Sequence, residues 1–180
     1  MLIMLLYGAA LRISEALFLT LADVDLHACL LTIRESKFYK TRLVPMGPDL
    51  TRNLKTFVEQ RAQEYSTKPE ASLFLTRYGD PLARSTAENT FRRLCIRAGV
   101  RRCDGSRYQP RLHDLRHAAA VHRLVSWYRE GADVNRLLPQ LATYLGHVHI
   151  SGTQRYLTMT PELLHEASMR FESYAQGDLQ

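Results

Sequence analysis

The sequence has little cysteine and no cysteine pattern. Its three cysteines, Cys29, Cys95 and Cys103, are odd in number and show no CxxC spacing, so neither a disulfide scaffold nor a zinc ribbon is indicated. Internal repeats, low-complexity tracts and a glycine-rich phosphate loop are also missing, which argues against a solenoid, a disordered linker and a P-loop nucleotide hydrolase. We expect free thiols in a reducing compartment, and therefore a cytoplasmic protein.

A long hydrophobic run is missing as well. The nearly apolar segment 1–11 is interrupted by Arg12 and the polar residues after it, well short of the roughly 20 residues that a membrane span needs. No basic segment precedes it, which argues against a signal peptide. We expect a buried helix that continues to Leu21. Because a buried helix is an unusual place for a protein to begin, we also expect further chain before Met1.

The composition indicates a globular, basic protein. The hydrophobic fraction is 46% of 180 residues, which suits one domain with its own core and argues against disorder. Lys and Arg number 24 against 18 Asp and Glu, which gives a net charge of +6 and a pI near 9.4. Such a balance favours an acidic partner, with nucleic acid the first candidate.

Periodicity predicts a mainly α-helical protein with one small antiparallel sheet, an α+β fold. Residues 30–33 and 43–44 form a hairpin, and lysines lie at its tip between 35 and 40. The further expected elements are a helix over 49–65, a short strand at 73–75, a turn at 78–81, a helix from a capping box at 85–88 to Gly99, a helix from His113 to about Glu130 with Gly131 as its C-cap, a short helix from Pro139 to Gly146, and helices starting at Ser151 and at Thr160-Pro161.

The predicted helix after residue 112 carries a polar face. His113, Arg116 and His117 lie at i, i+3 and i+4, so they share one face of a helix. The opposite, core-facing side then carries Leu112, Leu115, Ala118, Ala119 and Val121. Two imidazoles and a guanidinium form a good receptor for an oxyanion such as phosphate. Taken alone, the same pattern also suits an ordinary solvated helix face.

An arginine-rich stretch leads directly into this face. Between residues 92 and 111 the only acidic residue is Asp104, whereas the arginines are Arg92, Arg93, Arg97, Arg101, Arg102, Arg107 and Arg111. A solvated basic loop is one interpretation, but its position before the polar face favours contact with a phosphate backbone. The predicted contacts to DNA phosphates are Lys40, Arg42, Arg101, Arg102, Arg107 and Arg111.

Several residues suited to phosphoryl transfer occur in a characteristic order. They lie in the motifs Leu11–Glu15, Lys37-x-x-Lys40-x-Arg42, His113-x-x-Arg116-His117, Leu145-Gly146-His147 and Tyr156. This ordered set resembles the tyrosine recombinase family of phage and transposon integrases, over roughly residues 5–165. The resemblance implies the DNA breaking-rejoining catalytic fold and a site-specific recombinase that acts on double-stranded DNA, as a homo-tetramer on paired sites and away from membranes. It also implies a single catalytic domain over 1–180 that lacks the N-terminal core-binding domain and the opening helix.

The resemblance implies a role for each catalytic residue. Tyr156 would attack the scissile phosphate and form a 3′-phosphotyrosyl link, with His113 accepting its proton. Lys37 would protonate the departing 5′-oxygen. The remaining catalytic residues, Arg12, Arg116 and His147, would bind the phosphate oxygens and stabilise the phosphorane. Rejoining would need no cofactor, neither ATP nor metal, because the phosphotyrosine conserves the bond energy.

Other interpretations remain open at this level. Arg12 and Glu15 could be a simple ion pair, Lys37 and Lys40 could serve solubility at a sheet edge, and Tyr156 could be a half-buried amphipathic side chain. Within the recombinase interpretation, His117, Glu15 and Asp114 are expected to be structural, orienting or capping groups.

Two alternatives concern the whole function. One is a DNA-binding remnant or regulatory fragment of a recombinase without catalysis. The other is a metal hydrolase, since the 113–117 motif mimics HExxH and His147-x-His149 could supply further ligands. Against the latter, Arg116 would lie beside the cation, and the acid is the shorter Asp114.

Overall fold

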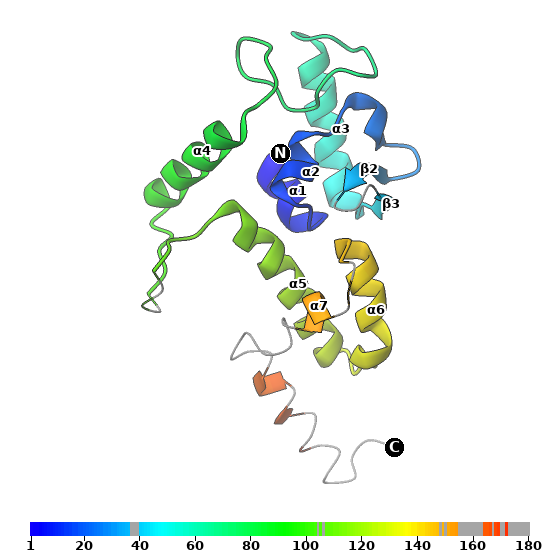
Figure 1. The fold of residues 1–180 in the computed structure, drawn as a ribbon, viewed down its shortest axis with the longest axis vertical. Helices are drawn as coiled ribbons and strands as arrows, with labels where there is room; N and C mark the ends of the chain where they lie inside the picture. The colour runs from blue at the N-terminus through cyan, green and yellow to red at the C-terminus, as the bar shows by residue number, and fades with distance from the viewer. Residues whose placement is uncertain are drawn as a thin grey trace. The chain divides into compact units, whose positions relative to one another are not determined.

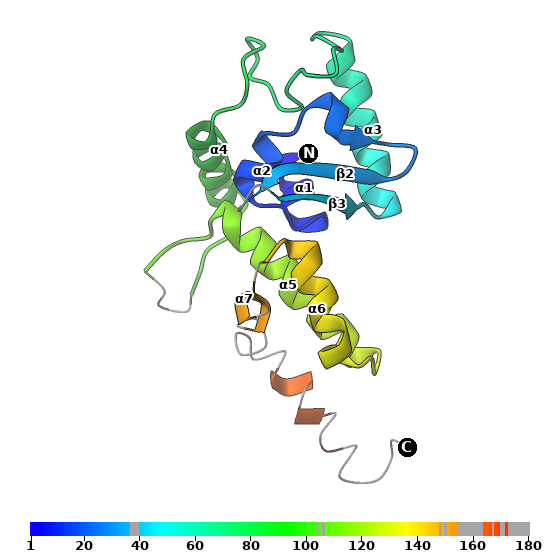
Figure 2. The same ribbon diagram turned by 45° about the vertical axis from the view of Figure 1, so that its right-hand side comes forward.

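The computed structural model describes residues 1–36, 40–103, 105, 107–147, 149, 151–154, 164–166, 168–169 and 172. The chain forms two compact units, Met1–Arg116 and His117–Gln180, and each is described by itself. Helices dominate and the sheet is small and antiparallel (Figures 1 and 2), which confirms the expected fold class. That residues 1–180 form one catalytic domain stays a prediction.

The first unit contains the sheet and four α-helices among the described residues. Its elements are α1 (Leu2–Gly8), α2 (Ile13–Leu17), the 3-10 turn η1 (Leu21–Asp23), β1 (Val24–Asp25), β2 (Leu30–Ser36), β3 (Lys40–Pro45), α3 (Pro48–Ala62) and α4 (Arg84–Arg97). Helix α5 (Leu112–Arg129) starts at the end of this unit, and the second unit continues with α6 (Val134–Leu145) and α7 (Ser151–Gln154). None of the described helices has the length and apolar character that crossing a membrane requires.

The sheet confirms the predicted hairpin. Its order is β1-β2-β3, with Leu31 opposite Val44 and Ile33 opposite Arg42 in the antiparallel β2–β3 pair. Because side chains alternate along a strand, Arg42 and Val44 point to the same face as Ile33. That face is the buried one, since Ile33 and Val44 are 2% and 0% exposed. The hairpin tip, residues 37–39, lies outside the described residues.

The predicted continuous helix over the first 21 residues is wrong. The chain leaves α1 after Gly8 and starts α2 at Ile13, and between them Ala10 adopts a left-handed conformation with φ 49°. The backbone N–H of Arg12 donates to the Glu15 carboxylate at 2.8 Å, which stabilises the new helix start. An apolar run alone cannot reveal such a break, because one continuous helix and two separate helices can have the same apolar sequence pattern.

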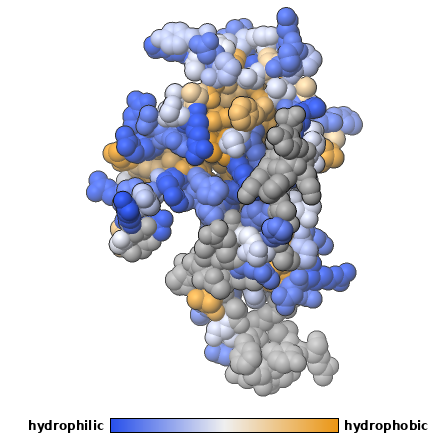
Figure 3. Space-filling model, viewed as in Figure 1, coloured by the Kyte–Doolittle hydropathy of each residue, from blue (hydrophilic) through white to orange (hydrophobic). Residues whose placement is uncertain are grey.

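Helix α1 is not buried all round. Leu5 and Leu6 are buried, but Ile3, Met4 and Tyr7 are about two-fifths exposed. Apolar surface is visible on the face of the molecule seen in Figure 3. The expectation of a fully buried helix is therefore corrected to an apolar helix that is buried on one side and partly exposed on the other.

The segment after α3 is held by a buried arginine rather than by a strand. Within residues 73–75, predicted as a strand, Leu75 makes a single isolated bridge, with Pro81. Arg61, on the last turn of α3, is 6% exposed and donates to the carbonyl oxygens of Ser66, Ser72 and Leu73. These bonds satisfy the loop backbone without a strand partner.

Helix α4 ends as predicted but starts differently. Gly99 follows it with φ 67°, as a C-terminal glycine should. The predicted capping box does not form, because α4 already begins at Arg84 after the N-cap Ala83. Glu88 instead accepts a hydrogen bond from the Arg84 side chain at 2.7 Å.

In the second unit, the apolar face of helix α6 is buried. Asp133 caps this helix by accepting from the Arg136 N–H at 3.2 Å, so the predicted start at Pro139 is wrong and Pro139 lies inside the helix. Gly146 ends it in the left-handed conformation, as predicted. The buried residues of α6 are Val134, Leu138, Leu141, Ala142 and Leu145.

The other helices of this part of the chain follow the prediction where the structure describes them. The α5 bounds match the prediction within about a residue, and α7 starts at Ser151 as predicted. The predicted helix start at 160–161 lies outside the described residues.

Candidate active site

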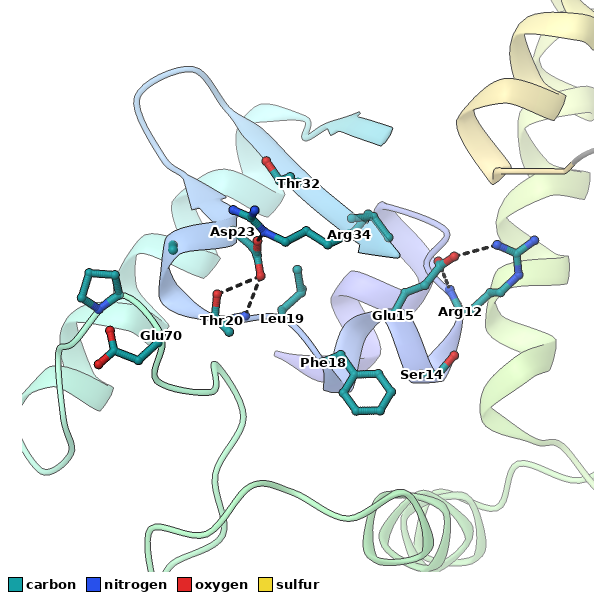
Figure 4. Close-up of a pocket in the computed structure, with 13 residues that line it drawn as sticks. Arg12, Ser14, Glu15, Phe18, Leu19, Thr20, Asp23, Thr32, Arg34 and Glu70 are labelled. Carbon is teal, nitrogen blue, oxygen red and sulfur yellow. Dashed lines mark hydrogen bonds and ion pairs between the residues drawn. The ribbon is translucent and has the colours of Figure 1, made fainter. Parts of the chain in front are cut away.

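The first unit gathers its candidate catalytic groups around the carboxylate of Glu15. This side chain lies on α2 and is 5% exposed. Arg12, at the N-cap position, donates from Nη1 to Glu15 Oε1 at 2.6 Å, in addition to its backbone contact (Figure 4). The Arg12 side chain remains 25% exposed, so its guanidinium is held by Glu15 and still reaches solvent.

Arg42 on β3 binds the same carboxylate in a bidentate manner. Its Nη1 and Nη2 donate to Glu15 Oε1 and Oε2, both at 2.9 Å. Burial by itself would raise the pKa of Glu15, but hydrogen bonds from Arg42 and Arg12, together with the charge of Arg42, lower it to about 2. Glu15 is therefore ionised throughout the physiological range.

Arg116 on α5 reaches this cluster from the far end of the first unit's sequence. Its Nη1 donates to the carbonyl oxygen of Ala10 at 2.6 Å and lies 3.8 Å from Glu15 Oε2. The side chain is 1% exposed, so the alternative interpretation of an ordinary solvated helix face does not hold for Arg116. The break at Ala10 supplies the buried carbonyl that Arg116 binds.

His113, one turn earlier on α5, is exposed. Its pKa is lowered, first by partial burial of the ring and then by the positive charge of Arg116. Asp114 accepts from the Arg111 N–H at 2.9 Å and from the Arg111 guanidinium at 3.0 Å, which confirms the expected capping role of Asp114. A neutral imidazole at the start of α5 can accept a proton near neutral pH.

An open groove of about 770 Å³ borders the Arg12–Glu15 end of the cluster. Figure 4 shows Arg12 and Glu15 at one side of it and Asp23 and Arg34 at the other. Arg34 donates to the buried Asp23 carboxylate, and Phe18 is 82% exposed beside the groove. Arg12 and Glu15 are thus among the residues that line this groove.

In the second unit the structure fixes the ring of His147. Its Nδ1 lies 2.8 Å from the hydroxyl oxygen of Thr153, which is fully buried. A Cβ on Gly152 would lie 3.4 Å from the same Nδ1, at van der Waals contact, so His147 packs closely against the start of α7. Thr153 was not predicted from the sequence, and its only signal is its position next to the small residues that open α7.

Two of the predicted catalytic residues, Lys37 and Tyr156, lie outside the described residues, as does the side chain of Lys40. Of the predicted phosphate contacts, Arg101, Arg102, Arg107 and Arg111 are exposed. Arg107 and Arg111 lie over the Tyr108 ring, at 5.5 and 5.6 Å from its centroid. Arg42 differs from the others, because its side chain is 11% exposed and ion-paired. The phosphate contacts stay predictions.

Within the part of the chain that the structure describes, no group of three or more His, Cys, Asp or Glu side chains could hold a metal ion. The described residues therefore give the metal-hydrolase alternative no ligand set.

Comparison with known proteins gives a consistent result. Residues 1–162 match the Phage integrase family. "Putative integrase/recombinase y4rB" of Sinorhizobium fredii is 44% identical over 169 residues, covering 93% of this chain and 54% of that protein. Tyrosine recombinase XerC of Chromobacterium violaceum is 36% identical over 155 residues, covering 86% of this chain and 46% of that protein. The chain thus spans about half the length of these curated relatives.

Comparison with solved structures also finds recombinases. The crystal structure of XerA recombinase matches with a TM-score of 0.72 and 25% identity, over 93% of this chain and 55% of that chain. The XerH site-specific recombinase in its pre-cleavage complex with difH matches with a TM-score of 0.66 and 26% identity, over 95% and 46%. The integrase of the Tn1549 transposon, in complex with transposon right end DNA, shares the fold at 19% identity and a TM-score of 0.68, over 96% and 57%. With a family match over most of its length and the fold of recombinase catalytic domains, this chain belongs to the phage integrase family of tyrosine recombinases.

Proposed function

We propose that the chain is the catalytic domain of a site-specific recombinase that cleaves and rejoins double-stranded DNA through a 3′-phosphotyrosyl intermediate. The observation that carries the proposal is the convergence of Arg12 and Arg116 on one carboxylate, at 2.6 and 3.8 Å from Glu15. Two guanidiniums held by a shared anion are preorganised to receive a second anion, such as a scissile phosphate.

In the proposed first step the phenol oxygen of Tyr156 attacks phosphorus. The P–O bond to Tyr156 forms as the bond to the 5′-oxygen breaks, and the 3′-phosphate stays attached to the tyrosine. His113 accepts the phenol proton, and its lowered pKa supports this role because the ring is neutral near pH 7. Lys37 gives a proton to the departing 5′-oxygen.

Charge on the phosphorane is stabilised by Arg12, Arg116 and His147. The contact between His147 Nδ1 and Thr153 supports a fixed orientation of the ring in this role. The reverse attack by a 5′-hydroxyl releases Tyr156 and rejoins the strand. Neither step uses ATP or a metal ion.

DNA as partner is supported by the related XerH, whose structure is a complex with difH, and by the net charge of +6. We further propose a homo-tetramer on paired sites, in the compartment that holds the DNA, the cytoplasm. We also propose that this catalytic domain works with an N-terminal core-binding domain, as its coverage of about half of its relatives suggests.

Covalent capture tests the proposal. The 180-residue chain is incubated with a pool of nicked duplexes of randomised sequence, in EDTA, and adducts that survive denaturation are isolated and their DNA is sequenced. We expect an adduct from the wild type and none from Tyr156→Phe, which should still bind the captured DNA. Tyr144→Phe is the matched control and should keep the adduct. An adduct that persists in Tyr156→Phe, or one that requires added zinc, would contradict the proposal, and a chain that binds DNA without any adduct would be the non-catalytic alternative.

A further inference from the structure

Arg42 occupies an unusual place for an arginine. The β2–β3 register puts it opposite Ile33, on the face of the sheet where Val44 is fully buried. Its side chain is 11% exposed, and a guanidinium is seldom buried so far without a dedicated partner. The partner is Glu15, which Arg42 binds through both of its terminal nitrogens at 2.9 Å. This residue is therefore built into the cluster instead of being part of the basic surface.

The bidentate contact with Arg42 determines how much hydrogen-bonding capacity Glu15 has left for the two arginines that are proposed to bind phosphate. A carboxylate has two oxygens, and Arg42 donates to both of them. Arg12 shares Oε1, whereas Arg116 stays 3.8 Å from Oε2 and donates to a backbone carbonyl. Without Arg42, the carboxylate would have free acceptor capacity beside two guanidiniums, and it would compete with phosphate for their donors.

We propose that Arg42 is a positioning residue for DNA strand cleavage, which occupies and neutralises Glu15 so that Arg12 and Arg116 stay available to the scissile phosphate. The inference rests on the proposed recombinase function and deepens it. With Arg42 present, the four side chains carry a net charge of +2, and without it the net charge is +1. The loss should therefore slow the chemical step while leaving DNA binding by the basic surface intact.

The chain offers a matched control. Arg34 lies on β2 of the same hairpin and is also paired with a buried carboxylate, that of Asp23. The Asp23 carboxylate accepts hydrogen bonds from the backbone N–H and the hydroxyl of Thr20 and from Nε of Arg34. The Arg34 side chain is more exposed than that of Arg42, 62% against 11%, so its removal tests the loss of an arginine–carboxylate pair on the hairpin without touching Glu15.

The experiment measures the rate of adduct formation at saturating DNA, with the nicked duplex captured by the wild type. We expect Arg42→Met to lower this rate on the order of 10- to 100-fold with unchanged DNA affinity, Arg42→Lys to be intermediate, and Arg34→Met to match the wild type. The decisive variant is the double substitution Arg42→Met with Glu15→Gln. If Arg42 acts by neutralising Glu15, removal of that charge should restore most of the rate lost in Arg42→Met.

Several outcomes would overturn the inference. Equal rates for Arg42→Met and Arg34→Met would do so, and so would a double variant as slow as Arg42→Met alone. Rescue of Arg42→Met by a 5′-bridging phosphorothiolate, whose leaving group needs no proton, would mean that Arg42 acts through the hairpin lysine instead.

A second readout separates this inference from the proposed function. Orthovanadate resembles the phosphorane and can be titrated into each variant by vanadium NMR without any DNA. Weaker vanadate binding in Arg42→Met, restored by Glu15→Gln and unaffected in Arg34→Met, supports the role of Arg42 even if the wild type forms no adduct. Equal vanadate affinity in all variants overturns it, and an unfolded Arg42→Met leaves Arg42→Lys to decide by the same two measurements.

Discussion

Glu15 sets the charge balance of the candidate site. Arginines can be assigned to phosphate binding from motif and residue type, and Arg12 and Arg116 were predicted in this way. What the sequence could not show is that Arg116 is 1% exposed and lies near Glu15, because this depends on a contact between distant segments. Periodicity placed Arg116 on a polar helix face without showing that it is buried, and the carbonyl of Ala10 and the carboxylate compensate for its burial.

His113 gives a prediction for the pH dependence. Its pKa lies below the ordinary value of 6.5, and only the neutral ring can accept the Tyr156 proton. The rate of adduct formation should therefore rise with pH along an acid limb whose midpoint lies below 6.5, and it should level off toward neutrality. We expect His113→Ala to be slow and to lose this acid limb in a pH series of single-turnover rates.

The control is His122, an exposed histidine further along α5. His122→Ala should keep both the rate and the acid limb of the wild type. An acid limb that survives in His113→Ala would assign the proton acceptor to another group.

At the scale of elements, helix ends with a glycine were predictable and helix starts were less so. Gly99, Gly131 and Gly146 follow their helices with positive φ, which only glycine adopts without strain. The break at Ala10 and the start of α6 at Val134 were missed. The first depends on the tertiary contact with Arg116, and the second on a cap by Asp133 that outweighs the helix-breaking tendency of Pro139.

Gly146 ends helix α6 and also positions the chain directly before the candidate catalytic residue His147. Its φ of 65° ends α6 directly before His147. Gly146→Ala should lower the free energy of unfolding by about 1–2 kcal/mol, since a Cβ strains the left-handed conformation. Urea denaturation measures this difference.

Gly47→Ala is the matched control, because Gly47 has φ −69° and no heavy atom within 4 Å of the added Cβ. It should change the stability little. Equal losses in the two variants would show that the conformation of Gly146 is not the cause.

At the scale of the whole molecule, the excess of basic residues is a sequence property that needs no fold. The order of the catalytic motifs likewise lies in the sequence, and the family match over residues 1–162 confirms the family that this order predicted. The network of Glu15 with its three arginines, by contrast, assembles α2, β3 and α5, and no local pattern reports it.

The exposed arginines before α5 give the last prediction. If Arg101, Arg102 and Arg107 contact DNA phosphates, each neutralises about one phosphate and releases counterions, so log Kd should depend steeply on log salt concentration. Replacing one of them with Gln should weaken binding to all sequences alike and reduce the slope by about 1, measured by fluorescence anisotropy from 50 to about 200 mM salt. Arg52→Gln is the control, since Arg52 is 71% exposed on α3 and paired with Asp49, and its slope should equal that of the wild type. A slope that falls equally in the control would show that the net charge of the chain, and not this stretch, determines the affinity for DNA.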